Sequence, residues 1–595
     1  MINKINIHSK KHILIVYVAL ILVTLVVYWQ VNQYDFVNID DNIYVTKNIN
    51  IQSGITLGGI RWAFTTIHSE LWNPLSLLSY MLDYHFYGLN AGGYHVTNLI
   101  LHILSTLLLF WLFNRMTGAI WESAFVAAIF AIHPMHVESV AWISERRDVL
   151  SAFFWMLTLC FYVYYTEKPN VKRYLLVLFY FVCALMSKSM VVTLPVVMIL
   201  LDYWPLKRFE LQKGNVLLWQ VKEKTPFFVL SAVFSILTIY AHRNRPIEHF
   251  PLSSCLANAS VSFMTYLYKT FLPHGMNVFY PFPQQIPVWQ ISVATILIIL
   301  ISFFIIVTAR RLPYLFVGWL WFAITILPVI GIIQDTDQAM ADRYHYLPSI
   351  GISIILAWGI PLLFLHKNMR KKILLPAGIA VLAIMSILAW QQCGYWKNSL
   401  ELCKHTLQVT TNNHVAHNCL AHALFEEGKL EEAIEHANEA IRLNPNHDKP
   451  YEDRAVFYFK LGHYQRAIED INKAVRLNPD DAFRYYLRGN MLKNLRQYQR
   501  AINDYNEAIR LKQDYAEAYN ERGGTYFNIG QHQRAINDYK EAIRLKQDYA
   551  EAYNNRAFVY INQGREEIGC NDAKKACELG NCRILDGARI RVLCR

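Results

Sequence analysis

The chain has 595 residues, enough for about four soluble domains, yet 54% of them are hydrophobic, 17% are charged, and the mean hydropathy is +0.18. This composition excludes an all-soluble chain, and an aromatic content of 14% with 10 scattered Cys excludes disorder, collagen and a small disulfide scaffold. The net charge of +12 must be located before it indicates nucleic-acid binding, because Lys and Arg also gather beside membrane spans.

Residues 12–29 predict a first transmembrane helix, an almost purely apolar run that follows Lys4, Lys10 and Lys11. The run ends without a small-x-small cleavage site, which favours an anchor over a cleaved signal peptide. Further apolar runs predict spans near 94–113, 118–133, 148–166, 173–187, 189–204, 226–241, 289–308, 313–331, 346–365 and 372–391. We therefore expect an all-α protein whose residues 1–395 form a polytopic helix bundle of about 11 spans.

The distribution of basic residues predicts the topology of these spans. Connections rich in Lys and Arg are expected inside, whereas the long loop 31–93 carries only Lys47 and Arg61 and is expected outside. The segment 256–272 is apolar but interrupted by Asn258 and Lys269, so we interpret it as an amphipathic or re-entrant helix. Everything after residue 391 then lies outside. The basic excess is a topology signal, and no nucleic-acid partner is expected.

After residue 413 the sequence repeats with a period of 34. Ala-Ile pairs recur at this interval, at Ala433-Ile434, Ala467-Ile468, Ala501-Ile502 and Ala535-Ile536. This period is typical of tetratricopeptide repeats, so residues 396–595 are expected to form an α-solenoid with four complete repeats and a fifth from about 550. The glycines Gly428, Gly462, Gly530 and Gly564 are expected where paired helices approach closely, with Arg496 in the corresponding position of the third repeat.

A solenoid of this kind binds a peptide on its concave face, and a rigid spacer without a ligand is the alternative. Residues at the same position of successive repeats are the candidate acceptor-binding side chains, namely Tyr451, Tyr485, Tyr519 and Tyr553. Four late cysteines either join in disulfides that fasten the terminal repeat or remain free buried thiols: Cys570, Cys577, Cys582 and Cys594.

Four groups of polar residues lie on the predicted outer side, and the first is Asp40-Asp41. Adjacent carboxylates at a membrane mouth can act as a general base, because mutual repulsion raises one pKa, or can hold a divalent cation such as Mg²⁺ or Mn²⁺. An ordinary Asp-Asp-Asn turn is the alternative interpretation of the same residues.

The other three groups place cations and histidines at the same membrane face. The second group is His133, His136 and Glu138, followed by Glu145, Arg146, Arg147 and Asp148. The third centres on Lys188, and the fourth is Asp342, Arg343, Tyr344 and His345, with Asp335 and Asp337 upstream, which lie outside the residues that the structure describes. A histidine and carboxylate pattern such as the second group can be half of a metal site. Two adjacent arginines outside run against the topology rule and favour an anion such as phosphate, which Lys188 and Arg343 would also bind.

Four sequence segments, in this order and followed by the repeats, resemble those of a known family: WNPLSLLSYMLDYHFYGLNAGGYHVTNLILH, HPMHVESVAWISERRDVLSAFF, LMSKSMVVTLPVVMILLDYWPL and MADRYHYLPSIG. The chain resembles the family of transmembrane and tetratricopeptide-repeat proteins, which are similar to the GT-C glycosyltransferases. The resemblance covers nearly the whole chain. It implies a multi-spanning enzyme that transfers a sugar, such as mannose, from a polyprenyl-phosphate carrier to Ser or Thr of a protein.

The resemblance assigns the catalytic role to Asp40 and Asp41. The basic residues at the same face are our candidates for binding the donor phosphate, namely Arg146, Arg147, Lys188 and Arg343. Similar sequences are expected to have a small residue at position 146, which leaves open whether Arg146 or Arg147 faces the site. Our candidates for lining the substrate site are His133, His136, Glu138, Asp342, Tyr344 and His345.

These observations lead to one expected function and two alternatives. We expect a membrane glycosyltransferase of a bacterial inner membrane, with its active site and repeats on the periplasmic side and an acceptor polypeptide held by the repeats. A non-catalytic membrane-anchored scaffold for an envelope complex is the first alternative. A transporter of lipid-linked sugar is the second, disfavoured by the paucity of midspan charges.

Overall fold

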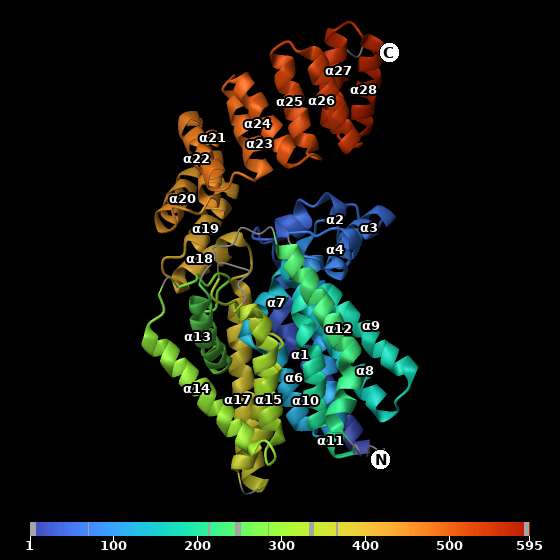
Figure 1. Cartoon of the computed structure of the whole chain (residues 1–595), viewed down its shortest axis with the longest axis vertical. Coiled ribbons are helices and arrows are strands. Elements are labelled where there is room, and N and C mark those ends of the chain that lie inside the picture. The colour runs from blue at the N-terminus through green and yellow to red at the C-terminus, as the bar shows by residue number, and fades with distance from the viewer. Residues whose placement is uncertain are drawn as a thin grey trace. The chain divides into compact units, whose positions relative to one another are not determined.

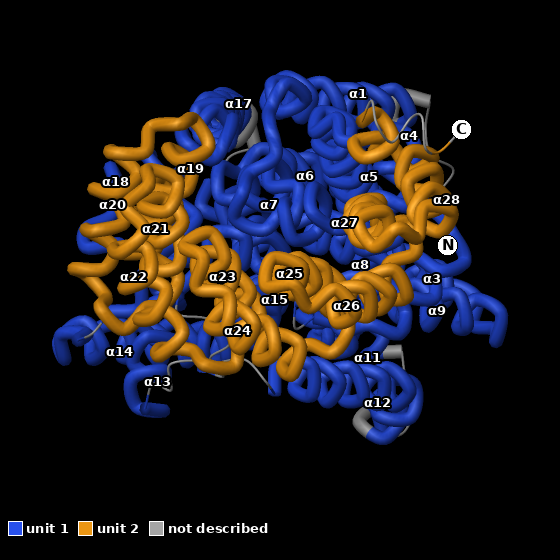
Figure 2. Tube along the Cα trace, turned by 90° about the horizontal axis from the view of Figure 1, so that it is seen from above, with its two compact units in different colours: residues 1–413 blue, residues 414–595 orange. Residues whose placement is uncertain are grey.

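The computed structural model describes residues 7–69, 71–211, 215–243, 251–283, 285–332, 338–364, 367–587 and 594. The chain divides into two compact units, Met1–Asn413 and His414–Arg595, which Figure 2 draws in blue and orange. The boundary lies C-terminal to the expected one at 395/396, because helix α18 (Ser399–Val409) packs with the first unit. There His405 Nε2 lies 2.9 Å from the carbonyl of Met276, and Ser399 Oγ accepts a hydrogen bond from the Asn38 amide.

The first unit is a bundle of helices in which the long loop before α5, expected on the outside and called the outer loop below, is itself folded (Figure 1). Its other α-helices are α1 (Ile7–Tyr28), α2 (Ile49–Gln52), α3 (Leu57–Thr65), α4 (Pro74–Tyr87), α5 (Ala91–Thr117), α6 (Ile120–Ile132), α7 (Val137–Ala141), α8 (Arg146–Glu167), α9 (Val171–Ser187), α10 (Leu194–Tyr203), α11 (Arg208–Leu211), α12 (Val216–His242), α13 (Leu252–Phe271), α14 (Val288–Thr308), α15 (Pro313–Ile326), α16 (Ser349–Gly359) and α17 (Lys367–Gly394).

The structure describes six helices long and apolar enough to cross a bilayer, which makes the chain a multi-pass membrane protein. They are Lys10–Gln33, Ala91–Thr117, Ile143–Glu167, Leu218–His242, Val288–Thr308 and Lys372–Gly394. A seventh is α6 with the segment Pro134–Ala141, if this pair, bent by 53°, counts as one span. Three further expected spans are shorter apolar segments, Ser189–Tyr203, Pro313–Val329 and Ser349–Leu363, because each contains a 3₁₀ turn and a proline that shorten its regular helix. Six or seven of the eleven expected spans are therefore present as long apolar helices among the described residues, and the other expected spans stay a prediction.

The segment expected to be amphipathic or re-entrant is helix α13, and it does not belong to the six long apolar helices. Its polar residues Asn258 and Lys269 are buried against the rest of the unit rather than facing outward. Asn258 Nδ2 donates to the carbonyl of Ala339, and Lys269 Nζ donates to the carbonyl of Gly275. The two residues that interrupted the apolar run thus attach α13 to the loops around it.

The outer loop folds into its own layer, which positions the acidic pair. Helices α2, α3 and α4 enclose a core in which Tyr44, Ile51, Leu77 and Tyr80 are almost fully buried. Tyr80 also donates its hydroxyl to the carbonyls of Ile143 and Ser144, each at 3.0 Å. The loop is therefore fastened to the turn that precedes α8.

The second unit consists of five antiparallel helix pairs, which confirms the repeats expected from the period. The pairs are α19 (His414–Glu426) with α20 (Leu430–Leu443), α21 (Lys449–Lys460) with α22 (Tyr464–Leu477), α23 (Ala482–Asn494) with α24 (Tyr498–Leu511), α25 (Ala516–Asn528) with α26 (His532–Leu545), and α27 (Ala550–Asn562) with α28 (Glu566–Glu578). Alanines such as Ala467 and Ala501 are fully buried where the helices of a pair meet.

The repeat glycines serve the turns rather than a close approach of helices, contrary to expectation. Gly428, Gly462, Gly530 and Gly564 have φ between 77° and 81°, and no heavy atom lies within 4 Å of a Cβ added at any of them. Arg496 adopts φ 59° at the same position of the third repeat. The turn between the helices thus requires left-handed backbone, which glycine adopts most easily and which Arg496 adopts at a cost.

The terminal repeat carries two disulfides, Cys570–Cys594 and Cys577–Cys582. Both connect α28 or its end to the C-terminal segment. Of the two interpretations of these cysteines, the structure therefore has the disulfides rather than free thiols.

Candidate functional site

The four polar groups identified in the sequence come together at one end of the first unit. Asp41 contacts Ser144, Lys188 contacts Glu145, and Arg343 contacts both Glu138 and Glu145. These residues come from the loop before α2, the turns on both sides of α7, the start of α8, the end of α9 and the turn Asp342–His345. Contacts between segments so far apart in the chain define a single candidate active site.

Asp41 is fully buried and both of its carboxylate oxygens accept hydrogen bonds. Oδ2 accepts from the Val37 amide at 2.8 Å, while Oδ1 accepts from the Ser144 amide at 2.9 Å and from the Ser144 hydroxyl. Burial raises the pKa of Asp41 to about 7, an effect that these hydrogen bonds oppose and the nearby charge of Asp40 reinforces. Asp41 therefore anchors the outer loop to the turn before α8.

Asp40 is only partly buried, and its backbone starts the next turn, since its carbonyl accepts from the amides of Ile43 and Tyr44. The pKa of the neighbouring Tyr44 hydroxyl is shifted by the charges around Asp40. Burial raises the pKa of the Tyr44 hydroxyl, Arg147 lowers it, and Asp40 and Glu145 raise it again. The Asp40 carboxylate thus acts on the same hydroxyl as Arg147 and Glu145, while remaining more exposed than Asp41.

Glu145 lies at the centre of three cations. Arg147 Nη2 is 2.7 Å from Glu145 Oε1, Arg343 Nε is 3.3 Å from the same oxygen, and Lys188 Nζ is 3.2 Å from Oε2. The Glu145 side chain is 1% exposed, whereas the three cations are 10–15% exposed. One buried carboxylate therefore holds three positive groups together at the edge of the accessible surface.

Each of the three cations also has a second partner. Lys188 Nζ lies 2.5 Å from Asp148 Oδ1, and Arg343 pairs with Glu138 through Nη1 and through its backbone amide. Arg147 Nη1 donates to the Tyr44 hydroxyl at 3.4 Å, but its buried Nε has no hydrogen-bond partner among the described residues. Arg147 thus has a donor available for a ligand.

A second polar cluster adjoins these cations around Asp342. Its Oδ2 accepts from the Tyr280 hydroxyl at 2.7 Å and from the Asn277 amide at 3.1 Å, and Lys269 Nζ lies 3.6 Å from Oδ1. Burial raises the pKa of Asp342, and the charge of Lys269 lowers it. Tyr344 lies beside the same cations, with its ring centroid 5.1 Å from Arg343 Cζ and 5.9 Å from Lys188 Nζ.

Arg146 belongs to a different environment from its neighbour. Its guanidinium is fully buried and donates to Asp83 at 2.6 Å, to the carbonyl of Tyr94 at 2.9 Å and to Asn98. Of the two alternatives left by the sequence, Arg147 is the arginine that meets Glu145 and Tyr44. Arg146 instead joins α8 to α4 and α5.

The histidines expected to line the site, His133, His136 and His345, are buried and adjacent to one another. Glu138 follows His136 by two positions and Arg343 precedes His345 by two. The histidine cluster therefore belongs to the same two segments as the Glu138–Arg343 pair.

Four residues of the site had no role assigned from the sequence: Glu145, Asp148, Lys269 and Tyr280. Glu145 and Asp148 flank the arginine pair, and Lys269 interrupts an apolar helix, so each carried the signal of a charge near a membrane face. Tyr280 carried none, because a single tyrosine in a loop has no distinctive neighbours in the sequence.

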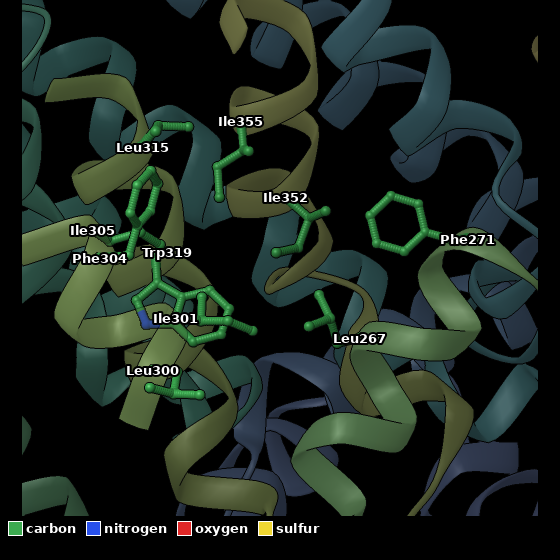
Figure 3. Close-up of a pocket in the computed structure, with 10 residues that line it drawn as sticks. All are labelled: Leu267, Phe271, Leu300, Ile301, Phe304, Ile305, Leu315, Trp319, Ile352 and Ile355. Carbon is green, nitrogen blue, oxygen red and sulfur yellow. The ribbon is translucent and has the colours of Figure 1, made fainter. Parts of the chain in front are cut away.

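An apolar pocket of about 450 Å³ lies between α13, α14, α15 and α16. Figure 3 shows its lining, with Leu267 and Phe271 on one side and Ile305, Leu315 and Trp319 on the other. Phe271 follows Thr270, whose hydroxyl contacts His345. The lining of the pocket thus includes the residue that follows Thr270 on α13.

In the repeats the tyrosines of the 34-residue series are partly buried, and each packs against the arginine three positions later. The distances from the arginine Cζ to the ring centroid are 5.7, 5.3, 5.2 and 5.6 Å for Tyr451, Tyr485, Tyr519 and Tyr553. The same arginines form ion pairs with an aspartate of the following helix, as Arg522 does with Asp538 at 2.7 Å. The tyrosines therefore belong to a regular ladder, and their role in binding an acceptor stays a prediction.

The hydrogen-bond donors around Asp41 compete with the divalent cation that was expected at the acidic pair. Three N–H or O–H groups already point at its carboxylate oxygens, an environment that a cation would have to displace. The Mg²⁺ or Mn²⁺ site stays a prediction, and Asp40 is the carboxylate more accessible to it.

Replacing Asp41 by Asn is expected to change how the stability of the protein depends on pH. The pKa of Asp41 is about 7 in the folded protein and 3.8 in the unfolded chain, so the folded state holds this proton more tightly. The stability that Asp41 contributes is fully present below about pH 4 and is lost as the pH rises through 7. The slope is at most about 1.4 kcal/mol per pH unit.

Asp41→Asn removes this pH-dependent loss, so the wild type should lose more unfolding free energy than the variant between pH 5 and pH 8, whatever the offset between them at pH 5. Thermal unfolding in detergent at both pH values measures the effect. The exposed Asp35→Asn in the same loop is the control. Parallel pH dependences for wild type and Asp41→Asn would contradict the assignment.

Sequence comparisons identify the repeats and the relatives of the whole chain. Tetratricopeptide repeat models match residues 414–447, 449–481, 489–530 and 525–564. Human protein O-mannosyl-transferase TMTC1 is 24% identical over 480 residues, which cover 70% of this chain and 53% of that protein. Caenorhabditis elegans protein O-mannosyl-transferase F38B6.6 is 23% identical over 396 residues, covering 64% and 54%. Human protein O-mannosyl-transferase TMTC4 is 24% identical over 472 residues, covering 67% and 62%.

The chain thus spans between about half and two thirds of the length of these curated relatives. Among solved structures, a crystal structure of MamA aligns with 27% of this chain and 94% of its own, at 28% identity and a TM-score of 0.26. YrrB, described as a tetratricopeptide-repeat protein with an unusual peptide-binding site, aligns with 30% of this chain and 92% of its own, at 20% identity and a TM-score of 0.27.

The matched repeats lie in the second unit of the structure, and the long apolar helices lie in the first. The chain is a multi-pass membrane protein with C-terminal tetratricopeptide repeats, homologous to the transmembrane and tetratricopeptide-repeat proteins named protein O-mannosyl-transferases.

Proposed function

We propose that this chain is a GT-C-type glycosyltransferase that moves mannose or another hexose from a polyprenyl-phosphate carrier to Ser or Thr of an exported protein. The observation that carries the proposal is the convergence of Arg147, Lys188 and Arg343 on Glu145, beside the Asp40–Asp41 loop. Three cations next to a partly exposed carboxylate suit a reaction in which a phosphate leaves as a hydroxyl attacks. The names of the relatives support the transfer of mannose.

In this mechanism Asp40 is the general base and Asp41 positions it. A hydroxyl is a weak nucleophile, so a carboxylate within hydrogen-bond reach must take its proton as the anomeric carbon is attacked. Asp40 is the more accessible of the two, whereas both oxygens of Asp41 are engaged by Val37 and Ser144. Attack from the face opposite the departing phosphate inverts the anomeric carbon.

The three cations stabilise the negative charge on the leaving phosphate. Arg147 has a buried Nε without a partner among the described residues, and Lys188 has a third N–H beyond those used on Glu145 and Asp148. Because Glu145 holds the cations in place before the donor arrives, little reorganisation is needed during the reaction. Arg146, which is committed to Asp83, has no part in it.

The apolar pocket between α13 and α16 is our candidate for the start of the polyprenyl chain. Its lining consists of aliphatic and aromatic side chains, which suit an isoprenoid, and Phe271 places one end near the turn that carries Arg343. A phosphate at the cations and a hydrocarbon chain in this pocket together describe one lipid-linked donor.

The repeats are proposed to hold the acceptor polypeptide. They follow the membrane unit directly in the chain, so a peptide bound by them stays at a high effective concentration near the active site. The partly buried tyrosines and their arginine neighbours offer aromatic and polar contacts to such a peptide.

We further propose that the repeats lie on the exported side of a bacterial inner membrane, and the two disulfides of the terminal repeat support this side. In intact cells, Cys577 and Cys582 should resist a membrane-impermeant maleimide until a reductant is added outside, because both thiols are oxidised and periplasmic. Labelling is read by mass spectrometry of the C-terminal peptides. The partly buried thiol Cys183 is the reference for unspecific reaction. Labelling without reductant, or only after lysis, would contradict the proposed side.

The transfer assay tests the reaction itself. Purified full-length protein in nanodiscs is incubated with radiolabelled polyprenyl-phosphate mannose and membrane-extract proteins as acceptors. We expect label on protein that is released by alkaline β-elimination, since the sugar is O-linked to Ser or Thr. Donor that binds but stays intact with every acceptor fraction would contradict the proposal and favour the scaffold or transporter alternative.

A further inference from the structure

Three histidine rings meet in the interior of the first unit, outside the steps described above. His133 precedes the turn Pro134–His136, His136 ends it, and His345 ends the turn Asp342–His345. Their ring centroids are 4.9, 5.3 and 5.5 Å apart, and one ring nitrogen of each lies within 4.8 Å of the others. All three side chains are at most 1% exposed.

The hydrogen bonds to one nitrogen of each ring fix which nitrogen carries the proton. His136 Nδ1 lies 2.8 Å from the carbonyl of Phe130, and His133 Nε2 lies 3.1 Å from the carbonyl of Thr270. A carbonyl can only accept, so both nitrogens are donors. His345 Nε2 lies 2.8 Å from the hydroxyl of Thr270, which already donates to the carbonyl of Tyr266 and must therefore accept from the histidine.

In neutral histidines the second ring nitrogen then carries a lone pair. His136 Nε2 and His345 Nδ1 are buried without any hydrogen-bond partner among the described residues, and His133 Nδ1 accepts only from the Met135 amide, at 3.2 Å. A buried acceptor without a partner costs about 1–3 kcal/mol. One water could pair with the two unpartnered lone pairs, whereas a cation would also bind His133 Nδ1 once this nitrogen releases the Met135 amide.

We propose that His133, His136 and His345 bind a single Zn²⁺ ion. Imidazole nitrogens are preferred ligands of zinc, and three histidines form a recurrent protein donor set for it, whereas Mg²⁺ and Mn²⁺ prefer oxygen ligands. The hydrogen bonds from the protonated nitrogen of each ring match the second shell of metal-bound histidines, in which the other N–H is given to a carbonyl or hydroxyl. Tetrahedral coordination brings ligand nitrogens to about 3.4 Å apart, a small closure of these rings.

The ion would join two segments that carry the active site. His136 lies two residues before Glu138, and His345 lies two residues after Arg343, so the metal would fix the turns between which this ion pair forms. Thr270 extends the connection to α13, because it accepts from both His133 and His345. The inference does not rest on the proposed transfer reaction, because binding of zinc is measured without it.

Zinc binding is tested with the full-length protein purified in detergent. After removal of loosely bound ions, the metal content is measured by plasma mass spectrometry, and ZnCl₂ is titrated into chelator-treated protein. We expect one zinc per chain in the wild type. X-ray absorption at the zinc edge should show imidazole nitrogens as the scatterers.

Two variants and a control distinguish a loss of zinc binding from a loss of folding. His136→Gln should lose stoichiometric zinc, and Thr270→Val, nearly the same in shape, should weaken zinc about 10- to 100-fold because His345 loses its hydrogen-bond partner. His102→Gln is the control, since His102 is equally buried but uses both nitrogens, on Tyr346 and on the carbonyl of Ala131.

Wild type without stoichiometric zinc, or with the same zinc affinity as Thr270→Val and His136→Gln, would overturn the proposal. If His136→Gln does not fold, wild type and Thr270→Val decide the question. A different metal held by the same histidines would overturn zinc as the ion.

Discussion

Asp40→Asn should abolish glycosyl transfer while leaving the fold and donor binding intact. Removing a general base costs about 10²- to 10⁴-fold in rate, and an amide of the same shape cannot take the hydroxyl proton. Asp40 is partly exposed and its backbone carbonyl, which makes the turn with Ile43 and Tyr44, is unchanged by the substitution. The expected result is therefore a fall in kcat with little change in KM for the lipid-linked donor.

The neighbouring carboxylates provide the comparison for this prediction. Asp35→Asn, on the same loop but exposed, should keep wild-type transfer. Asp41→Asn should lower both transfer and thermal stability, because an amide NH₂ would face the Val37 amide that now donates to Oδ2. Full transfer by Asp40→Asn combined with loss in a well-folded Asp41→Asn would reverse the roles assigned to the pair.

The repeats were predictable because their signal is a simple period. A residue interval of 34 identifies a pair of antiparallel helices whatever the details of packing, and the structure has five such pairs. The backbone conformation at the turns was not predictable from the glycines alone. Arg496 shows that a non-glycine residue can adopt the same φ, so the left-handed turn is required by the repeat rather than by glycine.

The members of the site were predictable in part because topology places charged loops at the same membrane face. Which of these residues pair with one another was not predictable, and Arg146 and Arg147 show the reason. Successive residues of a helix point about 100° apart, so the first turn of α8 sends Arg146 toward Asp83 and Arg147 toward Tyr44. Which direction meets the site depends on how α8 is rotated in the bundle, and that is decided by packing between distant segments.

The number of spans was also hard to predict, because packing and turns inside the bundle do not show in the sequence. An apolar run predicts burial in lipid or protein, but it does not reveal where a turn interrupts the helix. The run 189–204 begins with a 3₁₀ turn, Ser189–Thr193, and α10 is correspondingly short. Hydropathy alone cannot separate such a segment from a full span.

Arg343→Met should be the most destabilising substitution in the site. It leaves Glu138, 4% exposed, without its cation, and it removes one of the three cations around Glu145. Breaking a buried ion pair by removing one partner costs about 3–5 kcal/mol, because the remaining charge stays buried. Thermal unfolding in detergent should show a large fall in Tm, and transfer should be lost.

The double variant Glu138→Gln/Arg343→Met separates stability from donor binding. Neutralising both partners removes the unpaired charge, so most of the stability should return, whereas transfer should not, since the proposed phosphate-binding cation is still absent. Arg115→Met is the control for loss of an ion pair. The Arg115–Glu167 pair is 2.7 Å long but 42% and 37% exposed, and such pairs contribute less than about 1 kcal/mol.

Each outcome identifies a different property of Arg343. A single variant as stable as wild type would mean that Glu138 is neutral or solvated when Arg343 is removed. Wild-type transfer by the double variant would exclude Arg343 from the donor site and leave Arg147 and Lys188 as its cations. Recovered stability without recovered transfer is the result that the geometry around Glu145 predicts, because Arg343 contacts the site through the same carboxylate as the other two cations.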